Sequence, residues 1–161
     1  MLFPYTTGVP QGERTITISK IDFIKNPNLQ KKFEAKKEEF KQRNIPHQTI
    51  FTFHGTQIQN IDGICENNLN TINRAAHGHG YYFSEFPDVA LGYGPGLLMF
   101  KALPGNEYIG GQANLHYGPN ARFQSKKLPS HLVDENKKDC GDMVIIADNQ
   151  QFMPYCVIHL A

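Results

Sequence analysis

The sequence predicts a single α+β domain, and three observations support this. The chain has 161 residues, and a domain usually holds about 100–200. Apolar residues make up 40% and charged residues 19%, a globular composition that excludes a disordered tail, a collagen-like repeat and a coiled coil. The 11 phenylalanines, seven tyrosines, 14 glycines and ten prolines indicate aromatic-rich strands joined by many turns rather than a helical bundle.

The first third of the chain predicts a lead-in, a strand and a helix. Residues 1–13 contain two glycines and two prolines and show no apolar periodicity, so we expect an extended or mobile lead-in, with the domain spanning residues 14–161. Residues 15–21 alternate polar and apolar side chains, as a strand with one buried face does. Asn26 suits an N-cap before an amphipathic helix that ends near residue 44. Its lysines indicate a solvated helix face.

The remaining elements are predicted from short apolar runs between turn residues. We expect strands at 49–53, 81–84, 97–103, 143–147 and 155–160, helices at 57–66 and 87–91, and loops at 74–80 and 148–154. The segment 104–140 is rich in glycine, proline and polar residues. We interpret it as loops and short hairpins that serve a site.

Charge and cysteine usage limit the classes of partner and compartment. Sixteen Lys and Arg against 15 Asp and Glu give a formal charge of +1, so no global positive field attracts nucleic acid or a membrane, and any phosphate site must be local. The spacing of Cys65, Cys140 and Cys156 fits neither a disulfide framework nor a zinc knuckle. We expect a soluble intracellular protein, nuclear or cytoplasmic, without a signal peptide or membrane span, in which Cys65 and Cys156 are buried.

Several segments, in order, carry a resemblance to a known family. They are residues 18–39 with Asn26-Pro27, the tetrapeptide Phe53-His54-Gly55-Thr56, the run 78–84 (Gly-His-Gly-Tyr-Tyr-Phe-Ser), and residues 144–155. Together they resemble the catalytic domain of the poly(ADP-ribose) polymerase (PARP) superfamily of ADP-ribosyltransferases, in particular its mono-ADP-ribosylating branch. The resemblance implies two packed, mainly antiparallel β-sheets with flanking helices.

The resemblance also implies an activity and its partners. The domain would be a transferase of the glycosyltransferase class that cleaves the nicotinamide–ribose bond of NAD and passes a single ADP-ribose to a macromolecular acceptor, a protein by preference. NAD would be a co-substrate, and no metal would be needed. The protein would be a monomer that does not bind membranes. One alternative is a catalytically inert module that binds NAD or ADP-ribose. Another is transfer to nucleic acid, against which the near-neutral charge argues.

The same resemblance assigns roles to individual residues. His54 would bind an adenosine ribose hydroxyl, Gly55 would let its backbone approach the nicotinamide carboxamide, and Tyr93 would stack on the nicotinamide ring. Tyr82 would be the second member of the family's His-Tyr-Glu triad, and Tyr81 a wall residue on the opposite strand face. The full implied NAD-binding set is His54, Gly55, Thr56, Gly80, Tyr81, Tyr82, Phe83, Ala90 and Tyr93, with His54, Tyr82 and Met143 at the catalytic positions.

Two positions depart from the family pattern. The triad glutamate falls on Met143, which cannot hydrogen-bond a ribose hydroxyl, so polymer elongation is not expected. The neighbouring Asp142 would replace it only through a strand bulge, because a one-residue step turns a side chain to the other face. Ala90 stands where the family has a serine that binds nicotinamide, which removes a polar contact worth about 1 kcal/mol.

Other functional residues compete with structural interpretations. Taken singly, His54, Tyr82 and Tyr93 would be core residues, and their sequence neighbours favour the site. His77 and His79, with His116 or Cys140, lack the second ligand pair of a zinc site, so no metal is predicted. Arg122, Lys126 and Lys127 could face an acceptor or the NAD diphosphate, although we favour a solvated loop for these three.

Overall fold

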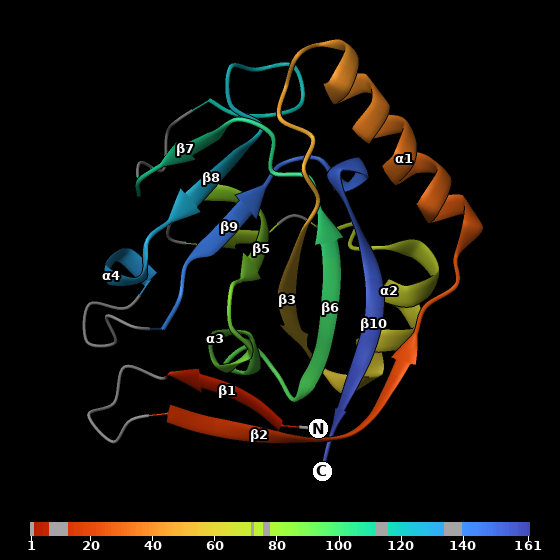
Figure 1. Cartoon of the computed structure of the whole chain (residues 1–161), viewed down its shortest axis with the longest axis vertical. Coiled ribbons are helices and arrows are strands. Elements are labelled where there is room, and N and C mark those ends of the chain that lie inside the picture. The colour runs from red at the N-terminus through yellow and green to blue at the C-terminus, as the bar shows by residue number, and fades with distance from the viewer. Residues whose placement is uncertain (1, 7–12, 72, 76–77, 112–115, 134–139) are drawn as a thin grey trace.

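The computed structural model describes residues 2–6, 13–71, 73–75, 78–111, 116–133 and 140–161 of the chain (Figure 1). Its strands are β1 (Leu2–Thr6), β2 (Glu13–Phe23), β3 (Ile50–Thr56), β4 (Asn73–Ala75), β5 (Gly78–Ser84), β6 (Gly96–Ala102), β7 (Glu107–Ile109), β8 (Ser125–Leu128), β9 (Met143–Ile146) and β10 (Phe152–Leu160). Its helices are α1 (Pro27–Gln42), α2 (Ile61–Asn67), α3 (Pro87–Leu91) and α4 (Ser130–Val133), with the short 3₁₀ helices η1 (Ile58–Asn60) and η2 (Asn149–Gln151). The mixed α+β class is therefore confirmed.

The strands follow one hydrogen-bonded path. Their order is β1-β2-β10-β6-β3-β5-β9-β8-β7, with β4 paired to β5. The pairs are antiparallel except for β7 with β8. The two separate sheets that the resemblance implies are not confirmed, because β3 and β5 connect the two halves. That connection is a single residue pair, Phe53 with Ser84, so the path is narrowest at its centre.

The helix α1 forms as the sequence predicts. The Asn26 side chain accepts a hydrogen bond from the backbone N–H of Leu29 at 3.1 Å, and Pro27 occupies the first turn. The chain leaves the helix after Gln42 through Asn44, whose φ is 56°. The apolar face of α1 packs into a buried cluster of Leu29, Phe33, Phe40, Ile45, Leu103 and Met153. Figure 1 shows α1 and α2 at the β10 side of the sheet and α4 beside β8.

The two faces of the sheet carry different apolar clusters. Tyr81 and Phe83 of β5 belong to one cluster, which contains the contacting rings of Phe100 and Phe152. Tyr82, between them in sequence, belongs to another, with Leu128, Met143 and Ile145. Alternation along a strand separates the two sets. The opposite orientation expected for Tyr81 and Tyr82 is thus a property of the fold.

Two expectations for the secondary structure are corrected, and two are refined. Residues 74–80 are not a loop throughout, because β4 and the first residues of β5 pair as strands. Residues 152–154 are not a connection but the start of β10, which pairs with β6. Leu2–Thr6 within the lead-in pairs with β2. The helix expected at 57–66 begins as η1 and continues as α2.

The segment 104–140 contains β7, β8 and α4 among loops. The short hairpins expected there do not form among its described residues, because β7 pairs with β8 in parallel and the antiparallel partner of β8 is β9, outside the segment. Within the described residues, no helix is long and apolar enough to cross a membrane.

Candidate active site

A cavity of about 370 Å³ lies where β3 and β5 separate beyond the pair of Phe53 with Ser84. The last residues of β3 form one wall, β5 forms a second, and α3 with the turn after it forms a third. The lining residues are Phe53, His54, Gly55, Thr56, Gln57, Asn60, Leu69, Thr71, Tyr81, Tyr82, Ser84, Ala90 and Tyr93. Seven of the predicted site residues therefore meet in one place: His54, Gly55, Thr56, Tyr81, Tyr82, Ala90 and Tyr93.

His54 enters the cavity as a neutral acceptor. Its ring lies against Phe83 and Phe100, with centroid distances of 5.9 Å to each. Its Nδ1 lies 3.2 Å from the carbonyl oxygen of Tyr82, and because a carbonyl accepts, Nδ1 donates. Burial lowers the pKa of His54 from its ordinary value of 6.5, against a smaller opposing effect of the Tyr82 carbonyl. With the proton on Nδ1 of a neutral ring, Nε2 accepts a hydrogen bond from a hydroxyl group.

Gly55 is required first by packing. A Cβ at this position would lie 1.6 Å from the carbonyl oxygen of Ala90 in α3. The absent side chain therefore makes room for a helix backbone, which the sequence interpretation did not foresee when it reserved the space for a ligand. As a result, α3 packs directly against β3. It also holds in place the turn after α3, which carries Tyr93.

Tyr93 stands at the edge of the cavity with 51% of its surface exposed. The turn that carries it is anchored by its backbone N–H, which donates to the Ala90 carbonyl at 3.0 Å. Gly94 has a φ of +155°, and a Cβ there would lie 2.4 Å from the Thr56 carbonyl oxygen, so this turn also packs against β3. A fixed backbone with an exposed ring suits stacking on a flat ligand.

The β5 wall contributes two tyrosines that play different parts. Tyr82 is buried, and its hydroxyl donates to the Gly78 carbonyl at 2.6 Å. Tyr81 packs edge-on against Phe152, with ring centroids 5.0 Å apart. Burial, with a smaller effect of Asp148, raises the pKa of Tyr81, so it stays a neutral phenol.

The comparison with protein families supplies the decisive observation. A family model described as the poly(ADP-ribose) polymerase catalytic domain matches residues 4–97, more than half of the chain. The chain belongs to the PARP catalytic-domain family. PARP domains use NAD as substrate, and membership supports an ADP-ribosyltransferase activity. A search of curated proteins gives no match.

Met143, for which the sequence analysis expects the triad position, lies on β9 beside the β5 wall of the cavity. Met143 pairs with Ser84, and the four pairs from Tyr81 with Ile146 to Ser84 with Met143 run in continuous register. Its side chain is buried with Tyr82, Leu128 and Ile145.

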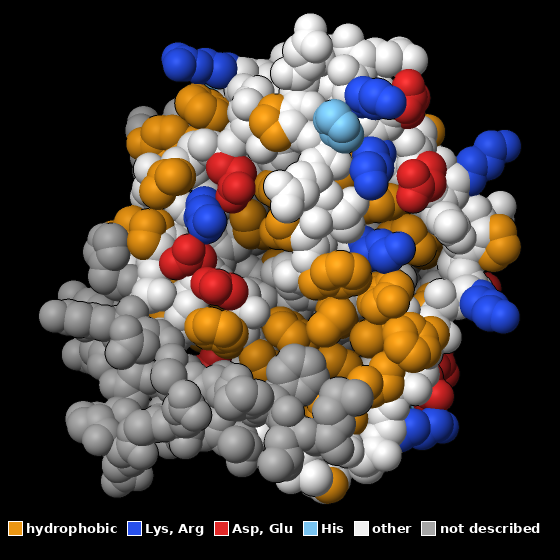
Figure 2. All heavy atoms as spheres, viewed as in Figure 1, with side chains coloured by type: hydrophobic (Ala, Val, Ile, Leu, Met, Phe, Trp, Pro, Cys, Tyr) orange, Lys and Arg blue, Asp and Glu red, His pale blue; other side chains and the backbone are white. Residues whose placement is uncertain are grey.

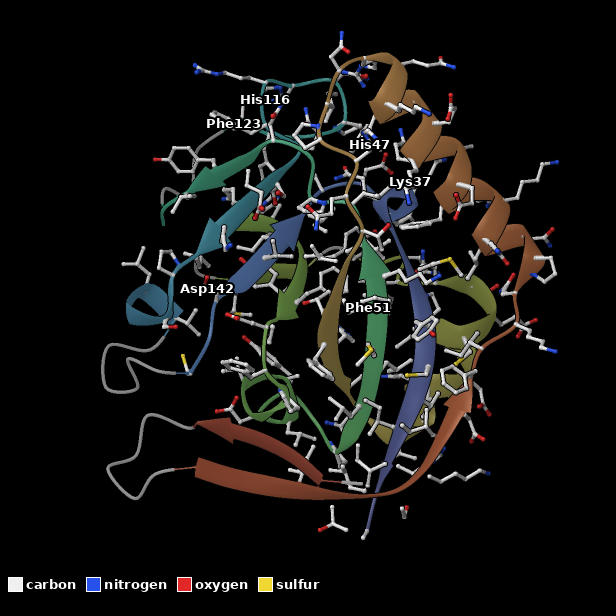
Figure 3. All side chains as sticks on the ribbon, viewed as in Figure 1. Lys37, His47, Phe51, His116, Phe123 and Asp142 are labelled. Carbon is white, nitrogen blue, oxygen red and sulfur yellow. The ribbon has the colours of Figure 1, made fainter. Side chains whose placement is uncertain are left out.

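The Asp142 carboxylate contacts Ser130 and Lys127. Its Oδ1 accepts from the backbone N–H of Ser130 at 3.1 Å, and its Oδ2 lies 3.8 Å from Nζ of Lys127. Figure 3 shows Asp142 just before β9, on the side of α4. In this register the carboxylate is engaged at the β8 side of the sheet.

Two other predicted residues of the PARP site support the cavity from outside. Phe83 is fully buried in the core cluster against Phe100 and Phe152. Gly80 packs under Tyr117, whose hydroxyl donates to the His79 carbonyl. Burial raises the pKa of Tyr117, which keeps this donor protonated.

Sequence analysis missed six of the residues that line the cavity. These are Phe53, Gln57, Asn60, Leu69, Thr71 and Ser84. Ser84 could have been found, since it shares the strand face of Tyr82 two positions away. Asn60, whose Nδ2 donates to Oγ1 of Thr56 at 3.2 Å, is placed by the η1 turn, and local patterns predict only a helix with approximate bounds there.

The remaining candidate residues lie in different environments. The expectation of a solvated Lys126 is wrong: it is 1% exposed on β8, with its Nζ 4.9 Å above the Tyr117 ring. The Tyr117 ring, nine positions away in the sequence, lies over it, which no local pattern shows. Arg122 is exposed.

The cysteines and the candidate zinc ligands complete the predicted set. Cys156 is buried, as expected, while Cys65 is only partly buried. His77 lies outside the described residues. Among the described ones, no cluster of His, Cys, Asp or Glu could hold a metal ion.

Proposed function

We propose that this PARP domain is a mono-ADP-ribosyltransferase that cleaves the nicotinamide–ribose bond of NAD and transfers one ADP-ribose to a protein acceptor. The observation that supports the proposal is a cavity of about 370 Å³ lined by His54, Gly55 and Tyr93, beside a strand on which the apolar Met143 stands where the resemblance expects the triad glutamate. We infer an intracellular site of action, consistent with the free thiols of Cys65 and Cys156.

The binding half of the proposal follows from the cavity groups. Nε2 of His54 accepts from an adenosine ribose hydroxyl, because its Nδ1 is committed to the Tyr82 carbonyl. The exposed ring of Tyr93 covers the nicotinamide face. The Gly55 backbone, held against α3, presents peptide groups to the carboxamide. Ala90 offers no polar side-chain contact, so nicotinamide binding depends on the backbone and the ring.

The chemical half follows from Met143. A thioether gives no strong acceptor for the nicotinamide ribose hydroxyl, so charge in an oxocarbenium-like transition state is not balanced by an enzyme carboxylate. Catalysis then depends on holding NAD in a reactive conformation and on the acceptor's own carboxylate. A first ADP-ribose is not activated for elongation, and the product is a single unit.

The alternative of an inert binding module is favoured by the same two residues, Met143 and Ala90. Incubation of the full chain with labelled NAD and a panel of protein and nucleic-acid acceptors separates these functions. We expect single ADP-ribose units on protein, read by mass spectrometry. Polymer ladders would contradict the position given to Met143. Stabilisation by NAD without any transfer would support the inert module.

A further inference from the structure

Three aromatic rings gather on the open face of four neighbouring strands. Phe23 ends β2, Tyr155 lies in β10 and Phe51 in β3, with β6 between the last two. Phe23 and Phe51 are 65% and 53% exposed. Both contact Tyr155, with ring centroids 5.4 and 5.3 Å apart. Figure 2 shows hydrophobic side chains over β3, β6 and β10, and Figure 3 labels Phe51 on this face. We call Phe23, Phe51 and Tyr155 the aromatic face.

A β-bulge places the central ring. Pro154 pairs with Phe100, and Cys156 pairs with Met99, so Tyr155 is an extra residue between two consecutive partners on β6. A bulge redirects a side chain that regular alternation would send elsewhere. Here Tyr155 lies between the two exposed phenylalanines, although Cys156 also points to this side of the sheet, into the cluster with Phe53 and Leu97.

Two lysines lie beside the aromatic face. The Nζ of Lys101 lies 5.1 Å from the centroid of the Tyr155 ring. The Nζ of Lys37 lies 3.3 Å from Oγ1 of Thr49, two residues before Phe51, and Figure 3 labels it above this face. The sequences of β3, β6 and β10 contain no aspartate or glutamate. On β2, Asp22 is occupied by Lys20 and His159.

We propose that the aromatic face binds single-stranded nucleic acid, with bases stacked on Phe23 and Phe51 and phosphates near Lys101 and Lys37. Exposed rings on a sheet accept any base through its π-face, and a few lysines follow the backbone. An acidic peptide would use the lysines but would leave two half-exposed rings without flat partners. Phe51 lies two residues before Phe53 of the cavity, roughly 7 Å along the strand. The surface is independent of the transfer chemistry proposed above.

Fluorescence anisotropy with labelled oligo(dT) and oligo(U) tests the proposal on the full chain. We expect saturable binding that F51A and F23A each weaken about 5-fold to 100-fold, the range for loss of one base stack. F51W retains binding, because it keeps an aromatic face. The matched control is I109A on β7, a residue with 66% exposure outside the face, which leaves binding unchanged.

The salt dependence gives a second, independent readout. One or two lysine–phosphate contacts on a single strand give a slope of log K against log salt of only about −0.7 to −1.4. K101Q should reduce its magnitude by about 0.7. A steep slope that F51A does not alter would overturn the proposal, since binding would then be electrostatic and located elsewhere.

Three further results would also overturn it. They are absence of oligonucleotide binding by folded protein, displacement of the oligonucleotide by a glutamate-rich peptide at equal concentration, and self-association that F51A abolishes without any oligonucleotide binding. The second would assign the face to an acidic protein partner and the third to another copy of the chain. Circular dichroism melting of each variant controls for folding.

Discussion

The two long walls of the cavity differ in what holds them. The β3 wall with α3 is fixed by backbone contacts, since Gly55 meets the Ala90 carbonyl and Gly94 meets the Thr56 carbonyl. It lies within residues 4–97, which the PARP family model matches. The β9 strand, which pairs with the β5 wall, lies beyond residue 97. Its Met143 side chain belongs to an apolar cluster. A backbone contact restricts which substitutions its residues tolerate. A side chain on a strand, by contrast, can be substituted while the strand keeps its position.

The β3 wall is most directly broken at Gly55. G55A puts a Cβ where the Ala90 carbonyl oxygen lies, and neither backbone can shift without loss of strand or helix hydrogen bonds. We expect a loss of about 3 kcal/mol or more in the free energy of unfolding, together with loss of NAD binding. Chemical denaturation measures the first effect and calorimetry the second.

The matched control for G55A is G63A in α2. A Cβ at Gly63 meets nothing within 4 Å, and alanine in place of a helical glycine stabilises by about 0.5–1 kcal/mol. If the two variants were equally stable, the close contact of α3 with β3 would be wrong.

The Gly55 contact also shows where sequence reasoning stops. The strand, the following histidine and the helix at 87–91 were each predicted from local patterns, and α3 forms at those residues. The packing of α3 against β3 at Gly55 depends on a contact between residues 35 positions apart. A glycine in the sequence does not indicate which distant segment will pack against it. The strand character of residues 152–154 was missed for a related reason, since Pro154 argues locally against a strand.

The site was predictable where a motif fixed both residue and strand. His54, Tyr82 and Tyr93 lie around the cavity because alternation and turn chemistry place them. Lys126 was not predictable, because its burial comes from Tyr117 and from strands beside it. The polar lining from Asn60 and Thr71 depends on where the chain passes after α2, which local patterns do not determine.

The role of the β3 wall in binding is tested at His54. H54A removes the Nε2 acceptor, and we expect it to abolish the rise in melting temperature that NAD gives, which follows RT ln(1 + [L]/Kd). The loss of ring contacts with Phe83 and Phe100 should cost only about 1–2 kcal/mol of stability. A variant that fails to fold would instead assign His54 to the core.

The third wall is tested at Tyr93. Y93A should weaken nicotinamide-site ligands by about 1–3 kcal/mol in calorimetry, because stacking and exclusion of water are both lost. Y93F retains the ring and should cost much less. Equal losses would show that the hydroxyl matters, and the stacking residue would then be another aromatic side chain.

The pH dependence of binding probes the His54 ring without a mutation. Because burial holds its folded-state pKa below 6.5, the unfolded chain takes up a proton first as the pH falls, so stability is complete above about 6.5 and declines below it. NAD binding should also weaken once the folded ring is protonated, since Nε2 then donates. Melting curves across this pH range measure the effect. H54A should remove the part of the pH dependence of stability that His54 contributes.

The smallest effect is expected on β9, the strand paired with the β5 wall, and it decides whether that strand carries chemistry. M143L conserves volume within the cluster of Tyr82, Leu128 and Ile145, so it should cost less than about 1.5 kcal/mol of stability. If Met143 serves only as an apolar side chain beside the cavity, both the transfer rate and the single-unit product remain unchanged.

D142N should likewise leave turnover intact, because the Asp142 carboxylate is engaged by Ser130 and Lys127. A large loss of transfer in D142N, with an unchanged melting temperature, would mean that Asp142 reaches the nicotinamide ribose during catalysis. The residue that precedes β9 would then supply an acid after all, and the difference between the β3 wall and this part of the chain would be one of position rather than of chemistry.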